Sequence, residues 1–211
     1  MKGALIVDDH PLMRMAIRLI LEKNNVEVVG EASDGPTAIH LAKQLYPSLV
    51  ILDISIPKMD GLEVISRMRA QGMQQKILVI SSHNQEHFAN RSAMAGAQGF
   101  IGKNEAMDEL WEAVKTLLAG RVYLPSGVFP QGHRTIESQS DSESQRLSSL
   151  SNREMIVLQY LARGWNNKAI AEELLLSSKT VSTYKARLQT KLDTQNLVDL
   201  FSLAKRHALI E

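Results

Sequence analysis

Five short apolar runs alternate with amphipathic segments over the first 120 residues of the chain. The apolar residues of each run follow one another with little alternation, which is typical of strands that are buried on both faces of a sheet. The segments between them have apolar residues at helical spacing, which predicts helices that cover such a sheet. The pattern therefore predicts a doubly wound α/β domain around a five-stranded parallel sheet. The runs are ALIVD, VEVVG, LVILD, KILVIS and GFIGK, and the helical segments are Leu12–Glu22, Pro36–Leu45, Leu62–Ala70, Gln85–Ala95 and Met107–Ala119.

Polar side chains stand where the predicted strands end. Asp8 closes the first run and Asp9 follows it, Asp53 closes the third, Ser81 closes the fourth and Lys103 closes the fifth. Ligands of such sheets bind beyond the carboxyl ends of the strands, so we expect these side chains to meet. Clustered carboxylates repel one another unless a cation compensates, and Mg²⁺ prefers oxygen ligands. A carboxylate beside Mg²⁺ can attack a phosphoryl group, with Lys103 adding positive charge and Ser81 a hydroxyl donor.

Each of these residues also has a plain structural explanation. An aspartate after a strand is usually a turn former or a helix cap, and a lone lysine is usually a solvated surface charge. Taken singly, each residue favours that explanation. The convergence of all five on one predicted edge favours a magnesium-dependent phosphoryl site instead.

The composition changes after the α/β pattern ends. Residues 121–149 are rich in Ser, Gln and Gly, which predicts a flexible linker. Apolar residues return at helical spacing over residues 150–211, which predicts a small all-helical domain of four helices. Residues 1–120 carry 12 Lys and Arg against 14 Asp and Glu, whereas residues 146–211 carry 10 against 6. A basic terminal module is expected of a part that meets nucleic acid.

Two absences exclude other classes of protein. The chain has no cysteine, which excludes disulfides, thiolate metal sites and cysteine nucleophiles. No run approaches the roughly 18 apolar residues of a membrane helix. Two aspartates interrupt the start MKGALIVDDHP where a signal peptide would continue its apolar run. We therefore expect a cytoplasmic protein with no membrane segment.

Local signals place the first and last helices of the terminal domain. Ser151 and Glu154 fit a capping box that opens the first helix, and Gly164 stands where that helix should stop. The fourth helix is expected at about Gln195–Lys205.

The two central helices form a helix-turn-helix pattern at about residues 167–186. A helix is predicted from Asn167 to Leu174, a tight turn falls at residues 176–177, and a second helix runs from Ser178 to Leu192. A helical bundle with an ordinary charged surface is the alternative explanation. The basic balance and the length of the turn favour the helix-turn-helix.

The helix predicted from Ser178 has one polar and one apolar face. Val181, Tyr184 and Leu188 recur at spacings suited to packing inward. The other face could meet base edges and phosphates in a major groove. Its residues are Lys179, Ser182, Thr183, Lys185 and Arg187.

Residues 1–120 resemble the receiver domain of two-component response regulators, which has a flavodoxin-like fold. LVILDISIPKMDG resembles the phosphoacceptor strand with its following loop, and VDDHP resembles the acid pair. The resemblance implies that Asp53 is the phosphoacceptor, that Asp9 binds Mg²⁺ directly and that Asp8 holds a metal-bound water. It also implies that the main-chain carbonyl of Ser55 binds the metal. Residues that shape the exit from the strand are Pro57, Asp60 and Gly61.

The same resemblance assigns a switch. Ser81 and Phe100 occupy the positions of the switch hydroxyl and the switch aromatic, and Lys103 that of the pocket lysine. Phosphorylation would draw Ser81 toward the phosphoryl group and let Phe100 rotate inward. Phe100 can instead be a simple core aromatic. Asn104 stands where many receivers have a proline, so this loop departs from the pattern.

The run from Leu150 to His207 resembles the DNA-binding domain of the NarL/FixJ/LuxR class. The resemblance implies that the helix from Ser178 enters the major groove. VDDHP together with SSKTVSTYKARLQTKL looks most like the BvgA/EvgA branch. The final helix would make a dimer contact, although its apolar residues can also cover the domain's own core; they are Leu197, Val198, Leu200, Phe201 and Ala204. The residues expected to contact DNA are Asn167, Lys168, Lys179, Thr180, Ser182, Thr183, Lys185, Arg187 and Lys191.

These patterns predict a response regulator with a receiver at residues 1–120, a linker at 121–149 and a LuxR-type helix-turn-helix domain at 150–211. It would accept a phosphoryl group on Asp53 from a cognate sensor histidine kinase. As a homodimer it would bind promoter DNA and regulate transcription, with RNA polymerase as a further partner. Mg²⁺ is the expected cofactor.

Two other classes compete with this prediction. One is an enzyme, an aspartate-dependent phosphatase or phosphotransferase. Ser55 argues against it, because an aspartate at that position would be the obvious general acid. The other is a ligand-gated regulator of the quorum-sensing kind, which needs an apolar small-molecule pocket rather than an acidic strand edge.

Overall fold

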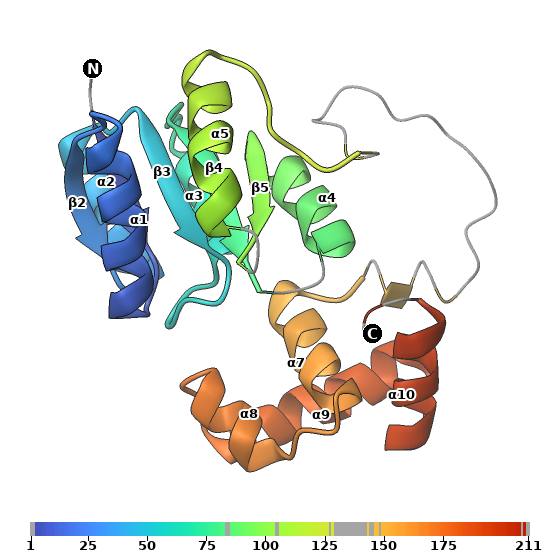
Figure 1. Cartoon of the computed structure of the whole chain (residues 1–211). Helices are drawn as coiled ribbons and strands as arrows, with labels where there is room; N and C mark the ends of the chain where they lie inside the picture. Colours follow the sequence, from blue (N-terminus) through green and yellow to red (C-terminus); the bar gives the residue numbers. More distant parts are fainter. Residues whose placement is uncertain are drawn as a thin grey trace. The chain divides into compact units, whose positions relative to one another are not determined.

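The computed structural model describes residues 3–82, 85–103, 106–126, 128, 143, 146–147, 149–207 and 209, with the main chain alone at 85–87 and 106–108. The chain forms two compact units, Met1–Arg134 and Thr135–Glu211. Figure 1 shows a sheet flanked by helices in the first unit and a group of helices in the second.

A five-stranded parallel sheet with strand order β2-β1-β3-β4-β5 organises the first unit. The chain steps outward from β1 to β2 and then returns to β3 on the other side of β1. The reversal opens a crevice beyond the carboxyl ends of β1 and β3. This topology confirms the predicted doubly wound α/β fold. The strands are β1 (Ala4–Val7), β2 (Val28–Ala32), β3 (Leu49–Asp53), β4 (Lys76–Ser81) and β5 (Gly99–Gly102).

Helices cover both faces of this sheet. α1 and α5 pack together on one face, and α2, α3 and α4 follow one another along the other (Figure 1). Their start and end residues agree closely with the predicted segments. They are α1 (Pro11–Lys23), α2 (Gly35–Leu45), α3 (Gly61–Ala70), α4 (Gln85–Ala95) and α5 (Ala106–Leu118).

Alternating strand residues supply a core on each side of the sheet. Ile6, Ile51 and Ile101 pack against Ile17 of α1 and Leu110 of α5, and all of them are fully buried. Their neighbours along each strand point to the opposite face, where Leu5, Leu52 and Phe100 are equally buried. Burial on both faces is the physical reason for the near-continuous apolar runs.

The loop from β3 to α3 is held against the end of β3. A β-carbon at Gly61 would collide with the main-chain oxygen of Asp53, so the loop requires glycine there. Asp60 caps α3 by accepting a hydrogen bond from the main-chain N–H of Glu63 at 3.0 Å. Lys58 has a positive φ of 65° and pairs with Asp34 at 2.7 Å.

The chain after α5 returns to the sheet. Tyr123 forms a parallel bridge with Gly99 at the edge of β5, and the main-chain N–H of Phe100 donates to the oxygen of Tyr123 at 2.8 Å. The start of the predicted linker at 121–149 is therefore bonded to the first unit. Pairing at a sheet edge adds main-chain hydrogen bonds that composition does not reveal.

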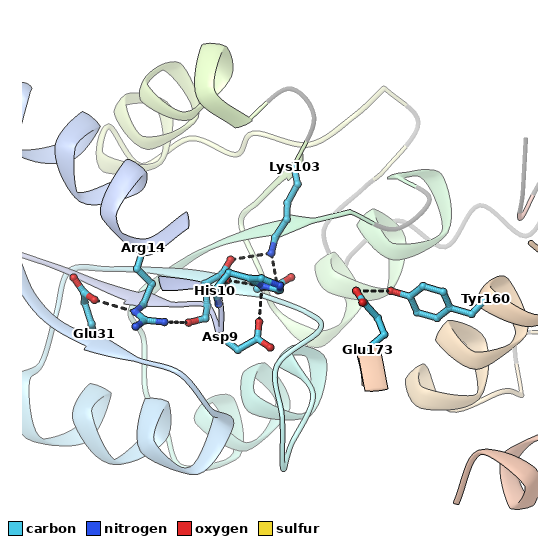
Figure 2. Close-up of polar contacts among 9 residues, drawn as sticks. Asp9, His10, Arg14, Glu31, Lys103, Tyr160 and Glu173 are labelled. Atoms are coloured by element: carbon cyan, nitrogen blue, oxygen red, sulfur yellow. Dashed lines mark hydrogen bonds and ion pairs between the residues drawn. The ribbon is translucent and has the colours of Figure 1, made fainter. Parts of the chain in front are cut away.

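The second unit is built from α7 (Asn152–Ala162), α8 (Asn167–Glu173), α9 (Ser178–Leu192) and α10 (Leu197–Arg206). The predicted capping box of Ser151 and Glu154 is present at the start of α7. Tyr160 packs against Trp165 in a tilted arrangement, with ring centroids 4.8 Å apart and an interplanar angle of 48°. Its hydroxyl donates to Glu173 of α8 at 3.5 Å (Figure 2).

Two helix ends show how the caps act. Gly164 follows α7 with a positive φ of 83°, the conformation that ends helices at glycine. α10 begins two residues later than predicted, because Asn196 caps it by accepting from the main-chain N–H groups of Val198 and Asp199. Within the described residues, no helix is long and apolar enough to cross a membrane.

Candidate metal site and nucleic-acid interface

The predicted acidic residues come together at the crevice between β1 and β3. Asp8 and Asp9 follow β1, and Asp53 is the last residue of β3. One potential ligand atom from each of Asp8, Asp9, His10 and Asp53 lies within 4.8 Å of the others. Asp8 and Asp53 are buried, whereas Asp9 keeps 18% of its side-chain surface exposed. The crevice thus opens to solvent on the Asp9 side.

Lys103 neutralises part of this negative charge. Its ammonium nitrogen lies 2.8 Å from Oδ2 of Asp53 and 2.9 Å from Oδ2 of Asp8 (Figure 2). β5 positions it, because the main-chain N–H of Lys103 donates to the oxygen of Ser81 at the end of β4. The lysine reaches Asp53 across β4, and it reaches Asp8 across β4 and β3, so that it meets the acids as the sequence predicts.

Burial sets the acid–base properties of the pocket. It raises the pKa of Asp53 to about 6 from an ordinary 3.8; Lys103 opposes this shift and Asp8 adds to it. Burial lowers the pKa of Lys103, but attraction by Asp53 and Asp8 outweighs it, so that the net shift is upward. The lysine therefore stays charged, and a further cation would favour the ionised form of Asp53.

The donor set fits a hard divalent cation. Oδ1 of Asp9 and Oδ1 of Asp53 are buried and accept no hydrogen bond from the residues described. Buried carboxylate oxygens without donors are costly, and a metal ion supplies the missing partner. Three carboxylates at a partly open crevice suit Mg²⁺, which keeps water among its ligands.

The remaining predicted pocket residues lie around this cluster. Ser81 is buried at the end of β4, one residue beyond the Ile80 that pairs with Asp53. Phe100 is 1% exposed and lies on the sheet face opposite Ile101, toward α4. Ser55 is half-buried in the loop after β3. Asn104 lies outside the described residues.

One contact of the acid pair was not predicted. The Arg14 guanidinium donates to the main-chain oxygen of Asp8 at 2.7 Å and to Glu31 of β2 at 2.9 Å (Figure 2). Arg18 binds the other oxygen of Glu31 and does not contact Asp8 in the structure described. The sequence signal that could have predicted this contact was Glu31, because a negatively charged residue inside a strand requires a cationic partner.

Replacing Arg14 by lysine should weaken Mg²⁺ binding about tenfold, the loss that follows when an outer hydrogen-bond partner of a metal site is removed. Lysine keeps the positive charge but lacks the planar guanidinium, whose several N–H groups donate to Asp8 and to Glu31 at the same time. Arg18→Lys is the matched control and should change Mg²⁺ affinity by less than about twofold. Isothermal titration with MgCl₂ measures both; equal losses would rule out a role for the Asp8 contact.

The predicted polar face of α9 meets solvent in the second unit, with Lys185 half-buried and the other four residues exposed. Val181 and Leu188 are fully buried, as predicted, and this turns the opposite face of the helix outward. Tyr184, which was also predicted to pack inward, is only half-buried. Four basic side chains of this region have no acidic partner among the described residues. They are Lys168 of α8 and Lys179, Lys185 and Arg187 of α9.

Hydroxyl groups on α9 bond locally. Ser182 and Thr183 donate to the main-chain oxygens of Ser178 and Lys179, each at 3.0 Å. Asn167 at the start of α8 donates to the hydroxyl of Ser182 at 3.0 Å and so ties the two helices together. The hydroxyl of Thr180 lies 2.8 Å from that of the capping residue Ser177. Asn167 and Ser182 thus share one edge of the surface.

Lys191 differs from the other basic residues of α9. Its ammonium nitrogen lies 2.7 Å from Oε2 of Glu154, whose side chain is 4% exposed. The pair links the end of α9 to the start of α7. Burial raises the pKa of Glu154, but bonds from Lys191 and Ser151 outweigh it and bring the pKa below its ordinary value.

The apolar residues of α10 divide into two sets. Leu200 and Ala204 are buried in the core of the unit. Leu197, Val198 and Phe201 are 43%, 70% and 45% exposed. The helix therefore covers its own core with one set and leaves the other on the surface.

Both units match known protein families. Residues 4–115 match the response regulator receiver domain, and residues 148–204 match the luxR family of bacterial regulatory proteins. These ranges correspond to the sheet with its helices and to the four helices of the second unit.

Full-length relatives share this arrangement. A transcriptional regulator of Pseudomonas aeruginosa is 49% identical over 100% of both chains. The virulence-factor transcription regulator BvgA of Bordetella pertussis is 45% identical over 97% of both. The DNA-binding transcriptional activator EvgA of Escherichia coli is 37% identical over 98% of this chain and 99% of its own. The predicted likeness to the BvgA/EvgA branch is confirmed.

A solved structure is similar over both units. RcsB of Salmonella enterica serovar Typhimurium, bound to promoter P1flhDC in the presence of the phosphomimetic BeF3-, is 26% identical over 97% of this chain and 98% of its own, with a TM-score of 0.60. The relatives are regulators of transcription rather than enzymes. The chain therefore belongs to the two-component response regulators of the NarL/LuxR family, which join a receiver domain to a LuxR-type helix-turn-helix domain.

Proposed function

We propose that a sensor histidine kinase phosphorylates Asp53 and that phosphorylation controls promoter binding by α9. The domains are a receiver at 1–120, a linker at 121–149 and a DNA-binding domain at 150–211. The observation that carries the proposal is the buried Asp53 carboxylate, paired with Lys103 beside two further aspartates, in a chain that also contains a helix-turn-helix. A cytoplasmic location follows, since the DNA is there.

The pocket residues divide the chemistry of phosphoryl transfer. Asp9, Asp53 and the Ser55 carbonyl would hold Mg²⁺ directly, with Asp8 holding a metal-bound water. When bound, Mg²⁺ neutralises charge on the transferred phosphoryl oxygens. A carboxylate oxygen of Asp53 attacks phosphorus as the donor's leaving group departs. The Lys103 ammonium, 2.8 Å from Asp53, binds the oxygens of the new phosphoryl group.

Ser81 and Phe100 would carry the change to the surface. Ser81 is the last residue of β4, which pairs with the strand of Asp53. Its hydroxyl would donate a hydrogen bond to the phosphoryl group. Phe100 lies on the face of the sheet that α4 covers, so that a change in its rotamer alters α4 and β5 together. Phosphorylation would thereby shift the population of the chain toward the conformation that binds DNA.

The DNA contact would be made by α8 and α9. Lys179, Lys185 and Arg187 meet phosphates and base edges in the major groove, and Asn167 and Lys168 meet the backbone at its rim. Thr180, Ser182 and Thr183 lie among these DNA-contacting residues of α9. Lys191 would contact a phosphate only if its ion pair with Glu154 broke. RcsB bound to promoter DNA with a phosphomimetic supports coupling of both events in one chain. Leu197, Val198 and Phe201 form the homodimer contact on inverted half-sites.

Lys185→Ala tests the groove assignment. Removal of one phosphate contact should reduce the slope of log Kd against log salt concentration by about 1. Footprinting with and without acetyl phosphate first identifies the promoter fragments that the chain binds. The Kd of the phosphorylated chain for these fragments is then measured over a series of salt concentrations. Lys43→Ala, on exposed α2 of the receiver, is the control and should leave the slope unchanged. An unchanged slope for Lys185→Ala would remove this residue from the interface.

A further inference from the structure

His10 lies at the mouth of the acidic pocket. It follows the acid pair directly and is the residue before α1, and its side chain caps no main-chain group there. Nδ1 of His10 lies 2.9 Å from Oδ1 of Asp9 and 3.3 Å from Oδ1 of Asp8 (Figure 2). The side chain is 64% exposed, so the imidazole meets solvent on one side and carboxylates on the other.

Nδ1 of His10 is within ion-pair distance of Oδ1 of Asp9, but the pair lacks the geometry of a hydrogen bond. Oδ1 of Asp9 is buried and has no hydrogen-bond partner among the residues described, although Nδ1 of His10 is 2.9 Å away. Adjacent ligands of an octahedral cation with bonds of about 2.1 Å lie roughly 3 Å apart. The two atoms therefore have the spacing of neighbouring ligands of one cation.

A second orphan atom belongs to the same cluster. Oδ1 of Asp53, on a side chain that is 1% exposed, is also buried without a hydrogen-bond partner in the described part of the chain. Ligand atoms of Asp53, Asp8, Asp9 and His10 lie within 4.8 Å of one another. The cluster thus offers one nitrogen and several oxygens to a single ion.

We propose that Nδ1 of His10 is a metal ligand of this pocket and raises its affinity for divalent transition metals relative to that for Mg²⁺. The inference rests on the metal site of the proposed function. Imidazole suits cobalt, nickel and zinc ions, whereas Mg²⁺ gains little from nitrogen. A neutral imidazole adds a ligand without adding negative charge, so it changes which ion is preferred more than it changes the total attraction for cations.

His10→Gln tests the proposal. The main-chain N–H of residue 10 donates to Oδ1 of Asp8 at 2.8 Å, and this bond is retained in the variant. The probe is Mn²⁺ bound to the full chain, followed by EPR and displaced by CoCl₂ or MgCl₂. His40→Gln, the same change at an exposed position of α2, is the control, and Asp9→Asn defines loss of the site.

The expected result is a loss of selectivity. His10→Gln should weaken Co²⁺ binding about tenfold and Mg²⁺ binding by less than about twofold, with His40→Gln unchanged. Pulsed EPR of bound Mn²⁺ should show nitrogen hyperfine coupling in the unsubstituted chain and in His40→Gln but not in His10→Gln. That coupling reports the ligand itself rather than the stability of the pocket.

The failures of the inference and of the proposed function are distinguishable. Unchanged Co²⁺ affinity and unchanged nitrogen coupling in His10→Gln overturn the role of His10 and leave the magnesium site intact. Equal losses of Co²⁺ and Mg²⁺ overturn it as well, because His10 would then only support the fold. Mn²⁺ binding that survives Asp9→Asn overturns both the inference and the metal site.

Discussion

Asp53→Asn should abolish phosphorylation of the chain by acetyl phosphate. The amide is nearly the same size as the carboxylate but lacks the charged oxygen that attacks phosphorus. The described pocket holds Asp53 against Lys103 at 2.8 Å, and Asp8 is the other carboxylate within reach of that lysine. Phosphate-affinity gel electrophoresis or radiolabelling should show labelling reduced to background, with loss of the promoter binding that phosphorylation induces.

Asp60→Asn is the matched control for this experiment. Asp60 lies in the same loop and caps α3, and asparagine caps helices as well as aspartate does. Labelling of this variant should persist. Full labelling of Asp53→Asn would contradict the assignment of Asp53 as the phosphoacceptor. Loss of labelling in Asp60→Asn but not in Asp53→Asn would contradict it as well.

Without divalent metal, Asp53→Asn should also stabilise the receiver. The pKa of Asp53 is about 6 in the folded chain, above its ordinary 3.8, because burial disfavours the charged form. A raised acid pKa gives stability that is fully present below about pH 4 and is lost as the pH rises through about 6. At about pH 8 the variant should therefore be more stable by up to about 3 kcal/mol, and the difference should vanish below about pH 4.

Urea unfolding in EDTA measures this difference. Trp111 is in α5 of the receiver and Trp165 is in the second unit, so fluorescence in a Trp165→Phe background follows the receiver. Added MgCl₂ should stabilise the unsubstituted chain by mass action and leave Asp53→Asn nearly unchanged. A variant less stable than the unsubstituted chain at about pH 8, or a difference independent of pH, would show that ionised Asp53 costs no folding energy.

The sequence by itself determined the architecture and the centre of the pocket. Buried strands require unbroken apolar runs, and amphipathic helices require a period near 3.6, so both are readable residue by residue. Parallel strands also end at one edge, which brings Asp8, Asp9, Asp53 and Lys103 together once the runs are identified. The capping box at Ser151 was predictable because it depends on residues close together in the sequence. The burial of Val181 and Leu188 was predictable because it follows the helical period.

Only the tertiary structure decided which distant side chains bond to one another. Arg14 reaches Glu31 and the main chain of Asp8, Tyr123 pairs with β5, and Lys191 bonds Glu154. Each contact joins elements that the chain separates, and its geometry depends on how helices and strands pack rather than on any period. Periodicity states which face of an element is buried, whereas the partner of a charged group on that face depends on packing in three dimensions.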